Sequence, residues 1–243
     1  GRPPEALAER LGVPLSTLEN TPRTYREFTL PKRSGGTRTI SAPCNDLKST
    51  QRLIHRRLLK RLPVHPSVTG FRPGYSIASN AACHVGKRVV VRMDIREFFA
   101  STSARRIQDY FAQIGWDRPS AKLLTRLCTH EGGLPQGAPT SPVLSNVVNF
   151  AMDARLDGLA KKCHATYTRY ADDITFSFSE DQRDDVKEEI QELTKKYEAD
   201  ASEAAKHRET EGQLPPSRIL DAVGMTLRGH QFSSPRGSTP CWL

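Results

Sequence analysis

The sequence lacks long apolar segments and closely spaced cysteines. In its 243 residues the aliphatic runs reach three residues, as at 89–91, whereas a membrane-spanning helix needs about 20 apolar residues. No charged and then apolar leader opens the chain, so nothing in the sequence indicates export. The five cysteines lie at least 35 residues apart without a CxxC pair, which excludes a disulfide framework and a thiolate zinc site. We therefore expect a cytoplasmic protein without a membrane partner.

Acidic residues are scarce in the first part of the chain. Residues 1–92 carry 17 Lys and Arg but five Asp and Glu, whereas residues 93–243 carry 19 and 22. Charge that serves only solubility would be scattered. The uneven distribution therefore favours a polyanion, such as a nucleic acid, that binds the N-terminal half.

The spacing of apolar residues predicts an α+β fold. Residues 5–20 are predicted to form two short helices, which favour a packing cap over a DNA-reading helix-turn-helix because Pro22 ends the second helix early. Residues 25–40 predict a hairpin with a Gly-Gly corner. Further elements are expected at 45–62 (helix), 76–85 (helix), 87–94 (buried strand), 103–115 and 119–130 (helices), from Pro142 (helix, burying Leu144, Val147, Val148 and Ala151), 166–178 (two strands), 181–209 (helix) and 219–227 (strand).

Three aspartates are candidates for a metal site. Asp94 ends the predicted strand 87–94, and Asp172 and Asp173 lie where the two strands of 166–178 meet. Carboxylates at strand ends are costly together unless a cation neutralises them. Oxygen ligands suit Mg²⁺, and two such ions can promote an in-line displacement at phosphorus. The alternative is a solvent-exposed acidic turn.

Four segments resemble motifs of reverse transcriptases. The string RYADDITFS resembles their YxDD hairpin, MDIREFF the strand with the first catalytic aspartate, GLPQGAPTSPVLSN the nucleotide-pocket segment, and LPKRSGGTRTISAP an upstream segment. The segments occur in the family's order, and the resemblance covers roughly residues 5–230. It implies a polymerase right-hand fold with an antiparallel palm sheet and fingers, and with a thumb that is absent or truncated.

The resemblance also implies a division of the chain. Residues 1–24 would form an N-terminal helical cap and residues 25–92 basic fingers that contact template and dNTP phosphates. Residues 93–232 would form the palm with the catalytic aspartates, with fingers helices near 103–130, and residues 233–243 a loose tail.

The family's catalytic residues match positions of this sequence. Asp94, Asp172 and Asp173 resemble the metal-binding triad, and the backbone carbonyl of Ile95 would complete one metal shell. Asp94 and Asp172 would hold both ions, while Asp173 would act less directly. The implied cofactor is a pair of Mg²⁺ ions, with Mn²⁺ as a substitute.

The resemblance places further residues around the incoming nucleotide. Gln136 would lie against the nucleotide and the template base, and Gly137 would keep the backbone close to the substrate. Phe99, five residues after Asp94, would exclude a 2′ hydroxyl, whereas Phe98 is assigned to the core.

Cations are expected on the phosphates of the substrates. Lys32 and Arg38 on the hairpin would clamp the triphosphate, with Arg33 as the alternative to Lys32. Arg72 would follow the backbone of template or primer. Arg52 and Arg56 belong to a basic helix that either faces phosphates or is a solvated surface.

A short motif indicates the retron branch of the family. Residues 80–84 (NAACH) match the NAxxH pattern of retron reverse transcriptases, although His84 is equally consistent with a satisfied helix histidine. Such enzymes copy a structured noncoding RNA into a branched RNA–DNA product in bacterial defence, from a 3′ or an RNA 2′ hydroxyl. The implied partners are this RNA, an RNA/DNA hybrid, dNTPs and an effector or toxin protein.

The sequence departs from the retron pattern beyond the YADD hairpin. Residues 222–224 read AVG where the family has VTG, and Lys206 is only a weak match to a lysine that would protonate pyrophosphate. A thumb would then lie beyond residue 243, come from another chain, or be dispensed with. These departures leave open another bacterial defence-associated or group II intron-like reverse transcriptase, acting with or without a template. An RNA-binding scaffold and a two-metal nuclease are further alternatives.

Overall fold

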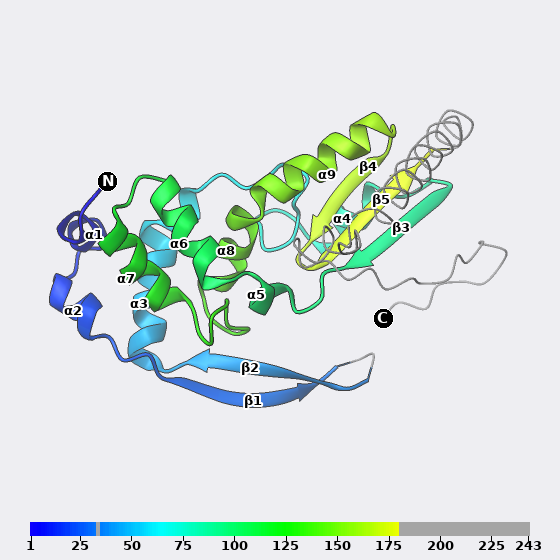
Figure 1. The fold of residues 1–243 in the computed structure, drawn as a ribbon. Coiled ribbons are helices and arrows are strands. Elements are labelled where there is room, and N and C mark those ends of the chain that lie inside the picture. Colours follow the sequence, from blue (N-terminus) through cyan, green and yellow to red (C-terminus); the bar gives the residue numbers. More distant parts are fainter. Residues whose placement is uncertain (33–34, 180–243) are drawn as a thin grey trace, which may run out of the picture.

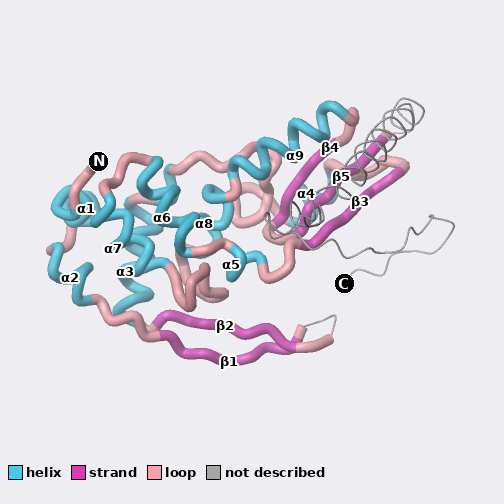
Figure 2. Tube along the Cα trace, viewed as in Figure 1, coloured by secondary structure: helices cyan, strands magenta, loops and turns pink. Residues whose placement is uncertain are grey.

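The computed structural model of the chain describes residues 1–32 and 35–179. The predicted helix 181–209, the predicted strand 219–227, the tail from 233 and Arg33 lie outside the described residues. Within them, helices gather at the N-terminal end of the molecule, a three-stranded sheet lies at the other end, and a separate hairpin runs along one side (Figure 1). Figure 2 shows the same division by type of element. No helix in residues 1–32 and 35–179 is long and apolar enough to cross a bilayer.

The helical lobe is built from short helices, two of which begin at a side-chain N-cap. Asp117 accepts a hydrogen bond from the amide of Ser120 at one helix start, and Ser103 accepts one from Arg106 at another, as N-cap residues do. Pro142 stands in the first turn of its helix, where its missing N–H costs nothing. The helices of this lobe are α1 (Pro4–Leu11), α2 (Leu15–Asn20), α3 (Asn45–Arg57), the 3₁₀ turn η1 (Leu59–Arg61), α6 (Ala104–Gln113), α7 (Arg118–Cys128) and α8 (Ser141–Val148).

The two N-terminal helices pack against the rest of this lobe. Leu7, Leu11 and Leu18 are fully buried or nearly so in one core cluster with residues of α3, α6, α7 and α8. Gly12 ends α1 in the left-handed conformation, which glycine adopts without strain. The prediction of two short helices that pack over a core is therefore confirmed.

The predicted hairpin is present as strands β1 (Tyr25–Pro31) and β2 (Thr37–Pro43). They pair antiparallel from Tyr25 with Pro43 to Pro31 with Thr37. Most residues of β1 are exposed, as is the first part of β2, whereas the end of β2 is partly or fully buried. The hairpin thus carries its cations on an open surface.

The sheet has the order β3–β5–β4 and is antiparallel throughout. Its strands are β3 (Val89–Asp94), β4 (Thr166–Tyr170) and β5 (Asp173–Phe178). Helix α9 (Phe150–Lys162) packs on β4, as does the short helix α4 (Ile77–Ala82). The antiparallel sheet expected from the sequence is therefore present.

Some expected details are wrong. The strand predicted at 87–94 is expected to be buried, but among the described strands β3 lies at the edge of the sheet, and its three valines, residues 89–91, are exposed by 36% or more. The helix expected over 45–62 breaks at Leu58 into a 3₁₀ turn. Ala151 was expected to be buried and is exposed, because a new helix, α9, begins at Phe150 and changes the buried face. The short helix α5 (Phe98–Ser101) was not predicted.

Among the residues that the structure describes, two hydrophobic clusters form the core. One fills the helical lobe, and the other lies under the sheet around Phe98, Ile174 and Phe176. Phe99 packs against both clusters. The residue predicted to touch the nucleotide sugar therefore stands at the junction of the two parts of the fold.

Candidate active site

The three aspartates converge at one end of the sheet. Asp94, the last residue of β3, is the direct partner of Asp173, the first residue of β5. The amide of Ile95 donates a 3.0 Å hydrogen bond to the carbonyl of Asp172. Directly opposed antiparallel residues have Cα atoms about 4.5–5.5 Å apart. The 78-residue gap between Asp94 and Asp172 is thus closed by strand pairing, as a shared metal site requires.

A tight turn presents Asp172. Tyr170 pairs with Asp173, so Ala171 and Asp172 form a two-residue connection between β4 and β5. Ala171 has φ of +58°, a left-handed conformation that costs a residue with a Cβ about 1 kcal/mol or more. Contacts with surrounding residues must hold this turn in place.

A buried ion pair supports the turn from below. Arg169 is fully buried and donates two hydrogen bonds, of 2.7 and 2.8 Å, to the carboxylate of Asp153 on α9. Its Nη1 also donates to the carbonyl of Ala171, at 2.9 Å. The hydroxyl of Tyr167 donates to the same Asp153 carboxylate. Arg169 therefore ties the backbone just before Asp172 to helix α9.

The loop before α4 is fastened to the same turn. The amide of Thr69 donates to the carbonyl of Arg169 at 2.9 Å, and Asn146 donates to the carbonyl of Gly70. A Cβ on Gly70 would collide with the backbone nitrogen of Ala171. Gly70 is thus required by close backbone approach.

Arg92 forms an ion pair with one of the three aspartates. Its Nε and Nη2 donate to the two carboxylate oxygens of Asp173 at 2.9 and 2.6 Å. The pKa of Arg92 is raised, chiefly by these hydrogen bonds and also by the charges of Asp94 and Asp172. The Asp173 carboxylate thus already has a cationic partner, and its part in holding the ions remains a prediction.

Asp172 lies in a less favourable electrostatic environment. Partial burial raises its pKa, and the charges of Asp94 and Asp173 raise it further, while a backbone hydrogen bond and Arg38 oppose the shift. Neighbouring carboxylates that resist ionisation favour a bound cation. The influence of Arg38 shows that β2 brings this cation within electrostatic reach of the aspartates.

The donor set at this end of the sheet fits Mg²⁺. Carboxylate oxygens of Asp94 and Asp172, together with a backbone carbonyl, are hard ligands of the kind that this ion prefers. Burial, the main cause, and the charges of Asp94 and Asp173 raise the pKa of Asp172, and a bound cation would offset both effects. The side chain of Ile95 is a hydrocarbon that packs in the sheet core. The backbone carbonyl is therefore the part of Ile95 that could serve as a metal ligand.

The predicted nucleotide-pocket segment lies against the hairpin. The amide of Ser41 on β2 donates to the carbonyl of Gln136 at 2.9 Å. Gly137 has φ of +128°, and a Cβ there would lie 3.0 Å from Ile40 Cγ2 and 3.2 Å from the carbonyl oxygen of Ser41. The close approach at Gly137 is therefore to β2, a contact that the sequence did not indicate.

The two phenylalanines after the first aspartate diverge. Phe98 is 5% exposed and belongs to the sheet core, whereas Phe99 is only partly buried. Their ring centroids are 5.4 Å apart. This placement agrees with the assignment of Phe98 to packing, and the assignment of Phe99 to the sugar remains a prediction.

The other predicted cations have different surroundings. Arg72 donates from Nη1 to the carbonyls of His65, Pro66 and Val68, and its guanidinium lies 4.5 Å from the ring of Tyr75. It is thus engaged in holding its own loop. Lys32, Arg52 and Arg56 are exposed, the first beside the hairpin turn and the others on α3 in the helical lobe.

His84 is a satisfied structural histidine. Its two ring nitrogens lie 2.6 Å from the hydroxyl of Ser177 and 2.7 Å from that of Thr168, on β5 and β4. Burial lowers its pKa, with Lys87 adding to the effect. Asn80 accepts a 2.6 Å hydrogen bond from Thr69. The polar residues of the NAxxH segment therefore fasten α4 to the sheet and its neighbouring loop.

Sequence reasoning missed Arg92, Arg169 and Asp153. Arg92 had a detectable signal, since it lies two residues before Asp94 on the same face of a strand. Arg169 directly precedes the YADD string. Nothing in the sequence paired it with Asp153, which comes from a separate helix.

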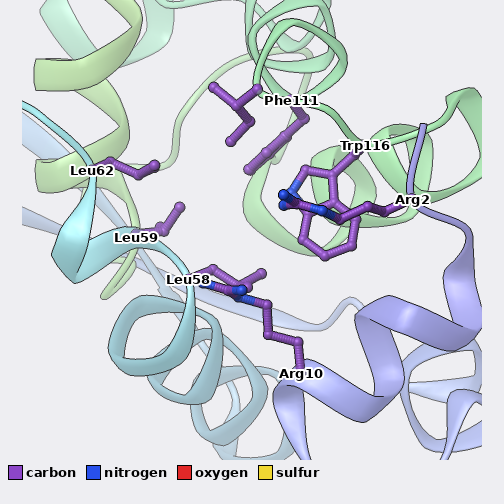
Figure 3. Close-up of a pocket in the computed structure, with 8 residues that line it drawn as sticks. Arg2, Arg10, Leu58, Leu59, Leu62, Phe111 and Trp116 are labelled. Carbon is purple, nitrogen blue, oxygen red and sulfur yellow. The ribbon is translucent and has the colours of Figure 1, made fainter.

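Two other features of the described residues lie outside this site. Glu27, His130 and Glu131 gather between β1 and the end of α7, where Glu27 already accepts from Ser41 and pairs with His130. A pocket of about 80 Å³ in the helical lobe has an apolar floor, over which two arginines reach (Figure 3). It is lined by Arg2, Arg10, Leu58, Leu59, Leu62, Phe111, Ile114 and Trp116.

Comparison with known proteins agrees with this geometry. Residues 30–208 match the family described as reverse transcriptase (RNA-dependent DNA polymerase). Three similar proteins are the retron Mx65 and Mx162 reverse transcriptases of Myxococcus xanthus, 40% and 39% identical over 72% of this chain, and the retron Ec86 reverse transcriptase of Escherichia coli, 37% identical over 63%. The matches cover 47%, 41% and 48% of those proteins, so the chain spans less than half of their length.

A solved structure shares the fold. The structure of telomerase from Candida albicans with a fragment of telomeric RNA matches 91% of this chain and 45% of its own, with a TM-score of 0.50 and 10% identity. At that identity the likeness concerns the fold alone.

Proposed function

Because this chain belongs to the reverse transcriptase family, we propose that it is an RNA-directed DNA polymerase of the retron type. The observation that carries the proposal is the register of the sheet, which pairs Asp94 with Asp173 and joins Ile95 to Asp172. The similarity to three retron reverse transcriptases supports the choice of branch.

The proposed reaction is nucleotidyl transfer. The oxygen of a 3′ hydroxyl, or of an RNA 2′ hydroxyl at initiation, attacks the α-phosphorus of a dNTP. A new P–O bond forms, the bond to pyrophosphate breaks, and the hydroxyl proton is lost. When bound, two Mg²⁺ ions, or Mn²⁺ in their place, would lower the pKa of the attacking hydroxyl and neutralise the leaving pyrophosphate.

The side chains divide this work. Asp94 and Asp172, with the carbonyl of Ile95, would hold the ions. Asp173, which pairs with Arg92, would act less directly and tune the charge of the site. Arg38 and Lys32 would bind the triphosphate, since guanidinium and ammonium groups suit phosphate oxygens. The role of Arg38 is supported by its effect on Asp172, whose pKa it lowers.

Further residues would select the substrate. Gln136 and Gly137 would border the incoming nucleotide, and Phe99 would exclude the 2′ hydroxyl of a ribonucleotide. Arg72, Arg52 and Arg56 would follow the backbone of the RNA or of the RNA/DNA hybrid. Residues 1–24 would act as a cap, 25–92 as fingers and 93–232 as the palm.

The cellular role belongs to the same proposal. The protein would act in the bacterial cytoplasm, copy a structured noncoding RNA into a branched RNA–DNA molecule, and serve antiviral defence with an effector protein. Primer extension on RNA and DNA templates with Mg²⁺ tests the polymerase, and sequencing of the copurifying nucleic acid tests the branch. A linear product without an RNA branch would instead favour a defence-associated or group II intron-like enzyme, the alternative raised by AVG at 222–224.

A further inference from the structure

Phe71 has an unusual combination of backbone and exposure. Its φ is +59° and its side chain is 40% exposed. A bulky residue rarely adopts the left-handed region, and such strain persists only where the surroundings impose it, most often at functional sites. Packing in the core does not account for a ring that is so exposed.

The residue is attached to a rigid segment beside the catalytic turn. The preceding residue, Gly70, lies so close to Ala171 that no Cβ fits between them. The carbonyl of Gly70 accepts a 2.9 Å hydrogen bond from Asn146. The backbone that carries Phe71 is thus fixed in place against Ala171, the residue that precedes Asp172.

The ring of Phe71 contacts the residue predicted to select the sugar. Its centroid lies 5.9 Å from that of Phe99, with the planes tilted by 40°. Phe98, in the core, contacts the same ring. The backbone carbonyl of Phe99 is held by the amides of Thr102 and Leu134. The backbone of Phe99 is therefore fixed by hydrogen bonds, and its ring, which packs on both core clusters, also lies against the rings of Phe71 and Phe98.

We propose that Phe71 is a specificity-determining residue for the nucleotide sugar, because its ring holds that of Phe99 where a 2′ hydroxyl is excluded. This inference rests on the proposed function. An aromatic pair contributes about 0.5–1.5 kcal/mol beyond its buried area. Converted at 1.4 kcal/mol for each factor of ten, that range is about a two- to twelvefold effect on selectivity.

The test compares single-nucleotide incorporation of a dNTP and of the matching rNTP on a primed RNA template. Phe71→Ala should lower the ratio of the two kcat/KM values by about two- to twelvefold, mainly by improving use of the rNTP. Phe71→Leu keeps apolar volume but loses the ring, and should lower the ratio in the same direction. Tyr75→Ala is the matched control, since Tyr75 lies in the same loop, is 45% exposed and contacts Arg72; its ratio should not change.

A double variant separates this role from general packing. If Phe71 acts through Phe99, adding Phe71→Ala to Phe99→Ala should not lower the ratio further. Equal losses for both nucleotides in the Phe71 variants, with an unchanged ratio, would overturn the inference. If Phe71→Ala does not fold, the ratio of the two kcat/KM values measured for Phe71→Leu is the deciding result. A parent chain that makes no DNA would instead overturn the proposed function, and this inference with it.

Discussion

Arg169 and Asp153 form a fully buried, two-pronged ion pair directly beneath the turn that carries Asp172. The same arginine donates to the carbonyl of Ala171. The turn that carries Asp172 is therefore anchored to helix α9 by a pair that has no contact with solvent.

Removal of one partner of this pair should be strongly destabilising. Asp153→Ala leaves the Arg169 guanidinium buried without its counter-charge, which costs about 3–5 kcal/mol of unfolding free energy. Urea denaturation followed by circular dichroism measures this loss. Asp109→Ala is the matched control, because its 4.0 Å pair with Arg105 is exposed and such pairs contribute about 0–1 kcal/mol. Equal losses in the two variants would contradict the assigned role.

Asp172→Asn should stabilise the metal-free protein at neutral pH. The folded-state pKa of Asp172 lies above its ordinary value of 3.8, so the folded state retains a proton that the unfolded state has released. The free energy of unfolding of the parent chain therefore falls as the pH rises from the unfolded-state pKa to the folded-state pKa of Asp172, and it stays lower at higher pH. With EDTA at pH 7 the variant should melt higher, by about 2–4 °C for each kcal/mol gained.

The melting temperatures of Asp172→Asn and of the parent chain, compared again at low pH, serve as the control for the measurement at pH 7. Below pH 3.8 both states of the parent chain carry a neutral carboxyl, so the difference between the two proteins should disappear. A variant that melts lower than the parent at pH 7 without metal would contradict a raised pKa of Asp172 in the folded state.

Arg92→Ala should strengthen the apparent binding of Mg²⁺. The substitution removes a cation that pairs with Asp173 at 2.6 Å and leaves that carboxylate for the metals. At solvent-like screening a unit charge several ångströms away is worth about 0.5–1 kcal/mol, or roughly two- to fivefold in affinity. The Mg²⁺ dependence of DNA synthesis measures the effect. Weaker Mg²⁺ binding than in the parent chain would mean that Arg92 orients Asp173 for the metal.

Arg38→Ala should impair nucleotide binding. Loss of a charged hydrogen bond to the triphosphate, worth about 1.5–3 kcal/mol, should raise the KM for dNTP by roughly ten- to a hundredfold. Arg105→Ala, which removes an exposed cation on α6, should leave this KM unchanged. If Arg38→Ala changes only the affinity for RNA, the residue contacts the template instead.

Much of the local structure could be predicted from the sequence, because it depends on neighbouring residues. The alternation around Ile174 and Phe176 indicated β5, and Pro142 indicated the start of α8. The convergence of Asp94 on Asp172 followed from placing both at strand ends, although the register itself came only with the structure.

The rest depends on contacts between distant segments. The exposure of residues 89–91 follows from the place of β3 at the edge of the sheet that residues 1–32 and 35–179 form, which an apolar run cannot indicate. The close approach of Gly70 to Ala171 joins two loops that are 101 residues apart. Arg72 was predicted on chemistry alone, and only the structure shows the carbonyls of its own loop around it.

Primer extension by Asp172→Asn tests the central claim most directly, with Asp109→Asn as the control on an exposed helix face. With Mg²⁺, dNTPs and a primed RNA template, the Asp172 variant should make no DNA while it binds RNA nearly as tightly as the parent chain, and the control should extend normally. Extension by Asp172→Asn at the rate of the parent chain would contradict the assignment of these aspartates to the metals.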